Sequence, residues 1–320
     1  MKVLIIGGAG YVGVPLAHSL QSGGHDVSVL DLFWYGDALK PTVQRFKGDL
    51  RDQKLLRQAL RDQDAVIHLA CVSNDPSSEL KPSLTRSINF ESFPETLIAV
   101  REANVRRFIF ASSSSVYGIQ DGDVTESRPC APLTDYSRYK ELCERMLWNT
   151  DMGNVAWTVL RPATVCGWSP RMRFDLVVNA MTRAALRDKV IPVTGGDQLR
   201  PNIHISDMVS AYAAVLSADI HTVHSRTYNV GGPNLSLRQI ADAVAAEVSL
   251  LGIRVEPTPT DDKRSYHIDS GRIAAEIGFQ PTFSVERAVS DICEQTSWGM
   301  NFNFDETRFF NVRRMKELFP

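Results

Sequence analysis

The chain has 320 residues, which is enough to bury a large hydrophobic core and to form two lobes. Its formal net charge of −2 argues against a general nucleic-acid-binding protein, because such proteins carry an excess of basic residues. The apolar content of 43% is that of a globular protein in water, and no apolar run reaches the ~18 residues that a membrane-spanning helix needs. We therefore expect neither a nucleic acid nor a membrane as a partner.

The five cysteines are widely spaced and include no Cys-x-x-Cys pair. Small thiols that stay reduced explain this pattern better than a disulfide framework or a zinc site does, and we expect no metal. The first strand already begins within residues 1–6, so the sequence indicates no signal peptide. Together these observations predict a cytoplasmic protein.

Four elements follow one another at the start of the chain: an apolar strand, a glycine-rich turn, an amphipathic helix and a second strand, over residues 3–6, 7–13, 14–20 and 27–30. An apolar run without a polar break is typical of a strand that is buried on both faces of a parallel sheet. Gly23 and Gly24 end the helix, and the second strand ends at Asp31. This order of elements predicts a dinucleotide-binding unit. The alternative is a flavodoxin-like turn that binds no nucleotide.

Three glycines of the turn have separate roles in such a unit. Gly7 permits the tight turn after the strand, Gly10 lets a pyrophosphate approach the positive end of the helix, and Gly13 allows close helix–strand packing. Asp31 lies 18 residues beyond Gly13 (31 − 13), where a carboxylate accepts hydrogen bonds from the adenosine ribose of NAD. Because a carboxylate repels a 2′-phosphate, the sequence favours NAD over NADP.

Strands and helices alternate from residue 2 to residue 161, which predicts a doubly wound parallel sheet of the α/β class. Further strands are expected at 44–47, 65–70, 108–110 and 156–160, and helices at 53–60, 84–103 and 137–148. The pattern changes after Gly167, so we expect a cofactor-binding domain at 1–166 and a smaller substrate-binding lobe at 167–320. Segments near 199–231 are expected to return to the first lobe. The charged and aromatic last twenty residues either cap the second lobe or mediate self-association.

Tyr136 and Lys140 are four residues apart and share one face of a predicted helix. An isolated tyrosine has a pKa of about 10, so a base that works near neutral pH needs ~4 kcal/mol of stabilisation. One ammonium group at ~4 Å provides about that much at an effective dielectric constant of about 20, and we therefore expect Lys140 to lower the pKa of Tyr136. The alternative is an ordinary residue pair on a helix surface.

The glycine spacing, the Tyr136–Lys140 pair and the serine run at 112–115 before Val-Tyr-Gly resemble those of the extended short-chain dehydrogenase/reductase family. Members of this family modify nucleotide-activated sugars. The resemblance spans nearly the whole chain, and its motifs are most specific over residues 1–165. It implies a Rossmann-like doubly wound sheet with a smaller C-terminal α/β lobe, NAD as the cofactor, a nucleotide-diphosphate sugar as the substrate, and a homodimer.

The resemblance also assigns site residues. Ser113, three positions before Val116, is the residue that hydrogen-bonds the reacting sugar hydroxyl, and it joins Tyr136 and Lys140 as the catalytic set. The positions that match cofactor contacts of the family are Gly7, Gly10, Tyr11, Val12, Gly13, Asp31, Asp49, Leu50, Leu69, Ala70, Asn89, Tyr136 and Lys140.

Three features near this site need separate interpretation. The resemblance assigns Asp49 to the adenine amino group, whereas the residues alone fit a helix N-cap before residues 53–60 equally well. The aromatic cluster at 33–35 either covers the adenine edge or packs a loop. His68 lies in the middle of an apolar strand, so we expect a packed, hydrogen-bonded core residue without a catalytic role.

Arg200 and Arg264 stand in motifs that resemble those with which the family holds the diphosphate of the nucleotide sugar. Guanidinium groups suit this role because their forked N–H donors match paired phosphate oxygens. The alternative is a pair of solvated surface arginines. Thr164 takes a substrate-binding position that is often Asn in epimerases, and Arg171 and Arg173 are candidates for further phosphate or carboxylate contacts.

The residues that follow Ser113 decide between reaction types. Nucleotide-sugar dehydratases of the family usually have an Asp-Glu pair there, to remove one proton and expel a hydroxyl, but this chain has Ser114 and Ser115. A serine hydroxyl is neither an acid nor a base near neutral pH, so the sequence favours epimerisation. The first hypothesis is epimerisation at carbon 4 through a 4-keto intermediate. Three alternatives stay open: a 4-dehydrogenase or 4-ketoreductase, a dehydratase that uses other groups, and a non-catalytic NAD sensor, which would not need the intact catalytic set.

Overall fold

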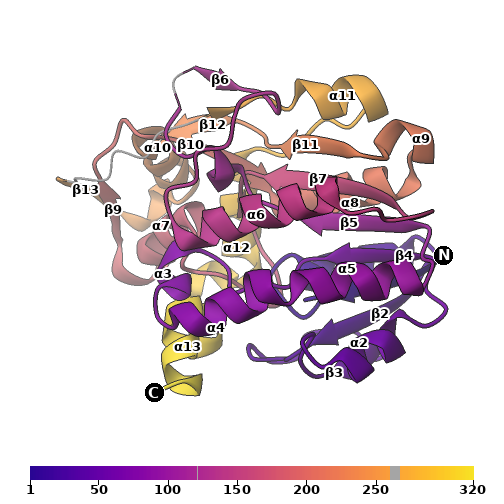
Figure 1. Ribbon diagram of the computed structural model, residues 1–320. Helices are drawn as coiled ribbons and strands as arrows, with labels where there is room; N and C mark the ends of the chain where they lie inside the picture. The colour runs from indigo at the N-terminus through magenta and orange to yellow at the C-terminus, as the bar shows by residue number, and fades with distance from the viewer. Residues whose placement is uncertain (121, 260–266) are drawn as a thin grey trace.

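A computed structural model describes residues 1–120, 122–259 and 267–320 (Figure 1). Its centre is a seven-stranded sheet with the order β11-β7-β5-β4-β1-β2-β3, in which every neighbouring pair is parallel. The strands are β1 (Lys2–Ile6), β2 (Asp26–Asp31), β3 (Gln44–Lys47), β4 (Ala65–His68), β5 (Arg107–Ala111), β7 (Ala156–Pro162) and β11 (Arg226–Val230). The strand order reverses between β1 and β4, which is the topological switch point of a Rossmann sheet. The predicted fold class is confirmed.

The alternation of side chains along β1 explains why this strand is apolar throughout. Val3 and Ile5 belong to the core on one face of the sheet, whereas Leu4 and Ile6 belong to the core on the other face. Successive residues of a strand point to opposite faces, so a strand that is covered twice has no position left for a polar residue.

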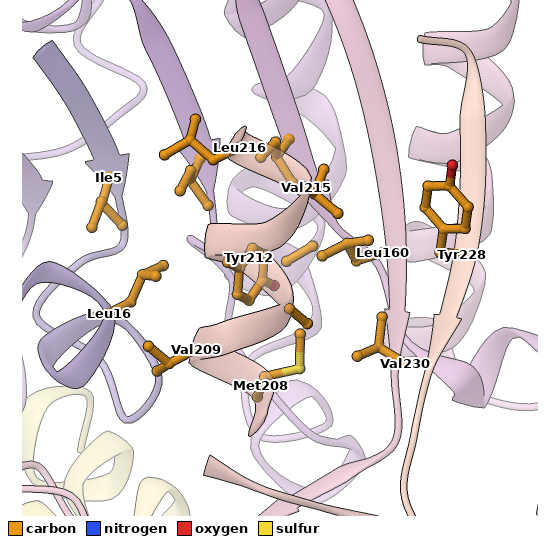
Figure 2. Packing of buried hydrophobic residues seen from close by; sticks show 14 of the residues in the cluster. Ile5, Leu16, Leu160, Met208, Val209, Tyr212, Val215, Leu216, Tyr228 and Val230 are labelled. Carbon is orange, nitrogen blue, oxygen red and sulfur yellow. The ribbon is translucent and has the colours of Figure 1, made fainter. Parts of the chain in front are cut away.

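Helices cover both faces of the sheet. α1 (Gly13–Ser22) and α8 (Ile205–Ser217) lie on one face, and α2 (Gln53–Leu60), α5 (Phe93–Glu102) and α6 (Asp135–Asn149) lie on the other. Figure 2 shows Met208, Val209 and Tyr212 of α8 packed among residues of the sheet. Each fully buried large apolar side chain contributes ~1.5–3 kcal/mol to the stability of the fold. The helices that cover the sheet are therefore a large part of what stabilises it.

The long helix predicted at 84–103 is present, but a π-helical turn interrupts it. The structure has α4 (Pro82–Arg86), a π-helical turn (Ser87–Glu91) and then α5. Ser92 N donates to Ser87 O at 3.2 Å, one residue further back than in an α-helix. Pro94 has no N–H to bond the carbonyl four residues earlier, which favours such a wide turn at this point.

The second lobe has its own small sheets and its own core. One sheet joins β12 (Asn234–Ser236), β10 (Leu199–His204) and β8 (Thr164–Cys166), and two-stranded pairs join β13 (Arg254–Thr258) to β9 (Val190–Thr194) and β14 (His267–Ile268) to β6 (Asp123–Val124). The principal helices are α7 (Val177–Asp188), α10 (Leu237–Glu247) and α12 (Val285–Gln295). Of the segments expected to return to the first lobe, β11 joins the large sheet, α8 covers it, and β10 pairs with β8, which lies within residues 1–166.

Short elements complete the chain. They are the α-helices α3 (Asp75–Ser78), α9 (Ile220–Val223), α11 (Gly271–Ile277) and α13 (Asn311–Leu318), and the 3₁₀ turns Ser114–Tyr117, Ser249–Leu251, Ser297–Gly299 and Thr307–Phe309. Within residues 1–120, 122–259 and 267–320, no helix is long and apolar enough to span a membrane.

The C-terminal segment contacts both lobes. Phe309 and Phe310 are buried in the core of the second lobe. α13, drawn in yellow in Figure 1, contacts the loop that follows β2: Arg314 Nε donates to Trp34 O at 2.6 Å, and the rings of Trp34 and Phe319 meet edge to face at 5.1 Å. The aromatic cluster at 33–35 is thus partly a packing surface for the end of the chain.

Candidate active site

A cavity of about 440 Å³ opens at the carboxyl ends of the central strands, between the large sheet and the second lobe. This is where open α/β sheets bind ligands. Fourteen of the predicted site residues line it: Gly7, Gly10, Tyr11, Val12, Gly13, Asp31, Leu50, Leu69, Ala70, Ser113, Tyr136, Lys140, Thr164 and Arg200. Asp49 and Asn89 are not among the lining residues, and Arg264 lies outside the described residues.

At two positions of the turn, the neighbouring backbone is so close that only glycine fits. Gly7 has a φ of +84°, and a Cβ atom there would lie 2.5 Å from the backbone nitrogen of Ala70, at the exit of β4. A Cβ atom on Gly13 would lie 2.6 Å from Gly8 Cα, so the helix packs on the turn itself. α1 begins at Gly13, and the positive end of its dipole therefore adjoins the cavity.

Asp31 is fixed by the turn that it faces. Its Oδ2 accepts a hydrogen bond from Ala9 N at 3.0 Å, and its Oδ1 accepts one from Phe33 N at 2.7 Å. Burial raises the pKa of Asp31, and the two backbone donors act in the opposite direction. Each carboxylate oxygen can accept a second hydrogen bond, so the carboxylate keeps the capacity to bind ribose hydroxyls.

Asp49 is paired with its neighbour Arg51 rather than with a helix. Arg51 Nη2 lies 2.6 Å from Asp49 Oδ2, and Asp49 Oδ1 also accepts from Arg51 N at 2.9 Å. The N-cap of α2 is Asp52, whose side chain accepts from Lys54 N and Leu55 N. The alternative that Asp49 caps this helix is therefore wrong.

Asn89 holds a loop of the cavity wall. Its side chain lies in the π-helical turn and is buried; Oδ1 accepts from Val72 N at 2.7 Å and Nδ2 donates to Val72 O at 3.0 Å. Because both backbone groups of Val72 are satisfied by one amide, the loop beyond β4 is fixed where it lines the cavity. In the structure, Asn89 is thus a positioning residue.

The catalytic set converges from two elements. Ser113 follows β5, and its Oγ accepts hydrogen bonds from Ser115 N at 3.1 Å and from Ser115 Oγ at 2.8 Å. Tyr136 lies in the first turn of α6, one helical turn before Lys140, and its hydroxyl is hydrogen-bonded to Ser113. A capping box starts this helix: Thr134 Oγ1 accepts from Ser137 N, and Ser137 Oγ accepts from Thr134 N.

The expectation that Lys140 lowers the pKa of Tyr136 is wrong for this structure. Lys140 Nζ donates to Ala111 O at 2.5 Å and lies 5.0 Å from the centre of the Phe110 ring. Burial raises the pKa of Tyr136, as do Cys71 and Asp75, while the hydrogen bond from Ser113 and the charge of Arg173 oppose the rise. Tyr136 is therefore a protonated phenol here, and further positive charge is needed before it can serve as a base.

A buried polar network behind the catalytic set was not predicted. Glu144, one turn beyond Lys140, accepts a hydrogen bond from Ser112 Oγ and forms an ion pair with Arg161. Arg161 Nη1 also donates to Tyr117 Oη at 2.7 Å. The sequence did contain a signal: Arg161 is the one charged residue of the buried strand β7, and a buried charge needs a partner.

His68 differs from its prediction in one respect. It is buried among the rings of Phe93, Phe108 and Phe110, as a core residue would be. However, in the part of the chain that the structure describes, neither of its ring nitrogens has a hydrogen-bond partner. Burial lowers the pKa of His68 to about 3, so the ring is neutral.

Three arginines bring positive charge to the cavity. Arg173 is paired with Asp175 at 2.9 Å and contacts Ser73 Oγ at 3.3 Å, Arg171 is almost fully buried, and Arg200 also lines the cavity, where its Nη1 donates to Leu199 O. Among the residues described, no group of His, Cys, Asp and Glu side chains is arranged to hold a metal ion.

Three features together define a dinucleotide-dependent enzyme. They are the Rossmann sheet, the glycine turn that faces a buried carboxylate, and the Ser-Tyr-Lys set at the switch point. The model of the NAD dependent epimerase/dehydratase family matches residues 3–231. The chain therefore belongs to this family, and its cofactor is NAD.

Individual proteins agree with this assignment. The chain is 30% identical over 310 residues to a UDP-glucose 4-epimerase of Lactobacillus helveticus, covering 88% of this chain and 92% of that protein. It is similar to the structure of MoeE5 in complex with UDP-glucuronic acid and NAD, at 27% identity and a TM-score of 0.81, over 94% of this chain and 99% of that one. DesIV, a dTDP-glucose 4,6-dehydratase from Streptomyces venezuelae solved with NAD, has 26% identity and a TM-score of 0.81, over 93% and 98%.

Proposed function

We propose that this protein epimerises a nucleotide-diphosphate sugar at carbon 4 through a 4-keto intermediate. The observation that carries the proposal is the Ser113–Tyr136–Lys140 set in the cavity, with Ser114 and Ser115 beside it instead of the acids that an elimination needs. NAD, when bound, accepts a hydride from the sugar and later returns it. Because the cofactor would return the hydride that it takes, no second substrate is required. Return to the opposite face of the ketone would invert carbon 4.

The chain's own residues then have separate tasks. Tyr136 takes the proton of the 4-hydroxyl and gives it back, and Ser113, which is hydrogen-bonded to Tyr136, orients that hydroxyl. Lys140, whose Nζ donates to Ala111 O, would hold the ribose hydroxyls of the cofactor. Positive charge on the oxidised nicotinamide ring would oppose the rise in the pKa of Tyr136 that burial causes.

We also propose the division of labour between the lobes. Residues 1–166 hold the cofactor, with Gly7, Gly10, Tyr11, Val12, Gly13, Asp31, Asp49, Leu50, Leu69, Ala70 and Asn89 as contacts or supports. The lobe from residue 167 holds the nucleotide sugar, with Arg200 and Arg264 on its diphosphate and Thr164 near the sugar. The presence of Arg200 and Thr164 in the cavity lining supports this assignment.

Elimination is the second candidate, because one other acid is near the base. Asp75 lines the cavity, contributes to the electrostatic environment of Tyr136, and accepts a hydrogen bond from Thr134 Oγ1 at 2.6 Å. The bond to Thr134 ties Asp75 to the cap of α6, which supports a structural role. A dehydratase would have to use this carboxylate in place of the missing pair after Ser113.

The reaction can be tested with a small set of substrates. UDP-glucose and UDP-glucuronic acid are the first two, because the first is the substrate of the named Lactobacillus relative and the second is bound in MoeE5. Each is incubated with purified protein without added cofactor, and the products are separated by chromatography. A 4-epimer supports the proposal, and a 6-deoxy-4-keto sugar supports elimination.

We propose further that the enzyme works as a homodimer in the cytoplasm. Ile98 on α5 and Trp148 on α6 are large apolar side chains that are about half exposed, at 44% and 51%, on the two helices that cover the same face of the sheet. All five cysteines are free, which fits a reducing compartment. Light scattering tests the dimer: Trp148→Glu should give a monomer, and an unchanged mass would contradict this surface.

A further inference from the structure

Arg171 is a buried cation without a carboxylate partner among the described residues, and it faces the cavity. Its relative exposure is 4%, and it lines the cavity together with the glycine turn and Asp31. Arg173, two residues later, is paired with Asp175, whereas the Nε of Arg171 has no hydrogen-bond partner in the described parts of the chain. A buried charge is costly unless it is paired, so this arrangement calls for an anion.

Three contacts hold the guanidinium group in place, and one of them is local: Nη1 donates to Met172 O at 3.2 Å. Its plane lies over the ring of Tyr35, with 3.8 Å between Arg171 Cζ and the ring centre. Its Nη2 donates to Asn311 Oδ1 at 2.5 Å, and Asn311 Nδ2 donates to Ser73 Oγ at 2.9 Å. Asn311 is the first residue of α13, so the C-terminal helix orients a side chain of the cavity. One face and both terminal nitrogens of the guanidinium are thus engaged, and Nε has no partner among the described residues.

The position of Arg171 along the cavity points to one particular anion. The ring of Tyr35 beneath it lies four residues beyond Asp31, and Ser169, two residues before Arg171, donates to Tyr11 O in the glycine turn at 2.8 Å. Arg173, two residues after Arg171, lines the same cavity as the catalytic set. In a dinucleotide that extends from Asp31 to Tyr136, the group between the two riboses is the diphosphate.

We propose that Arg171, oriented by Asn311 and Tyr35, is the counter-ion of the diphosphate of NAD. The second lobe and the C-terminal helix then contribute directly to cofactor binding, in addition to the glycine turn of the first lobe. This proposal concerns the cofactor alone and does not depend on which sugar the enzyme converts.

Calorimetric titration of the full-length protein tests this proposal. NAD, ADP, adenosine and UDP are each titrated into wild type and Arg171→Met. We expect affinity for NAD and ADP to fall by about ten- to a hundredfold, the value of a charge-assisted hydrogen bond, while affinity for adenosine and UDP stays unchanged. Binding of NAD and ADP within about threefold of wild type would overturn the proposal, and a loss for UDP alone would assign Arg171 to the nucleotide sugar instead.

Two further variants separate recognition of the anion from damage to the fold. Asn311→Asp keeps the size of the side chain and gives Arg171 a carboxylate partner, so it should weaken NAD about tenfold or more; unchanged NAD binding by this variant would also overturn the proposal. Arg183→Met is the matched control, because Arg183 lies over the ring of Phe310 and pairs with Asp305 outside the cavity. It should bind NAD as wild type does.

Discussion

The carboxylate of Glu144 and the guanidinium of Arg161 form a buried ion pair directly behind the catalytic set. Arg161 Nη2 lies 2.6 Å from Glu144 Oε2, and the two side chains are 8% and 3% exposed. Glu144 belongs to α6 and Arg161 to β7, so the pair fixes the helix that carries Tyr136 and Lys140 against the sheet. Tyr117, which accepts from Arg161, donates to Asn229 of β11 at 2.7 Å and extends this network to the edge of the sheet.

Breaking this ion pair should be costly. Glu144→Gln leaves the charge of Arg161 buried without a counter-charge, and we expect a loss of about 3–5 kcal/mol in the free energy of unfolding. The double variant Glu144→Leu/Arg161→Met should recover at least half of that loss, because no charge remains buried. Urea unfolding measures both. A single variant as stable as wild type would show that the pair does not stabilise the fold.

Tyr136 should be the base. Tyr136→Phe removes only the hydroxyl, so turnover should fall by about 10²–10⁴-fold while the dissociation constant for NAD changes little. Tyr139→Phe is the matched control on the same helix, because Tyr139 stacks on Phe90 outside the cavity lining. Residual activity of Tyr136→Phe above a tenth of wild type would move the base to another residue.

Nucleotide-diphosphate binding should depend on Arg200 and Arg264. Alanine at either position should weaken UDP by roughly 1.5–3 kcal/mol, the contribution of a charge-assisted hydrogen bond, and leave NAD unchanged. Calorimetry measures the affinity of each variant for both UDP and NAD, so NAD binding is the control for UDP binding in the same protein. If NAD weakens and UDP does not, the assignment of the two lobes is reversed.

His68 should make the protein sensitive to acid. The pKa of His68 is lowered from 6.5 to about 3 in the folded chain, so the unfolded chain takes up a proton first as the pH falls. The neutral, buried ring therefore contributes to the free energy of unfolding above about pH 6.5. That contribution is lost as the pH falls towards 3, by about 1.4 kcal/mol per pH unit. His68→Leu should remove that part of the slope in urea unfolding between about pH 6.5 and 4.5. Parallel slopes in the two proteins would show that His68 does not contribute.

The large sheet could be predicted because its signals are local and redundant. The run from Val3 to Ile6, the glycine turn and Asp31 each indicate the same unit, and β1 is apolar on both faces for a reason that sequence alone supplies. The π-helical turn between α4 and α5 was missed because a helical pattern continues through it, and the prediction did not weigh Pro94, which cannot donate to the carbonyl four residues earlier.

Parts of the site could not be predicted because they depend on residues far apart in the chain. The spacing of Tyr136 and Lys140 sets their common helix face, but it does not fix where a long, flexible lysine side chain ends, and here it reaches Ala111. Arg171 depends on Asn311, 140 residues away, and no local pattern links them. For Glu144 and Arg161 the signal was present, since an arginine in a buried strand requires a partner.

The most direct test of the proposed function follows the hydrogen at carbon 4. The protein is given a nucleotide sugar that carries deuterium at carbon 4, first UDP-glucose and then UDP-glucuronic acid, without added cofactor. We predict the 4-epimer with deuterium retained at carbon 4 and no net change in NADH absorbance, because the hydride returns to the carbon that it left. Deuterium at carbon 6 of a 6-deoxy-4-keto product, or stoichiometric release of NADH, would contradict the account.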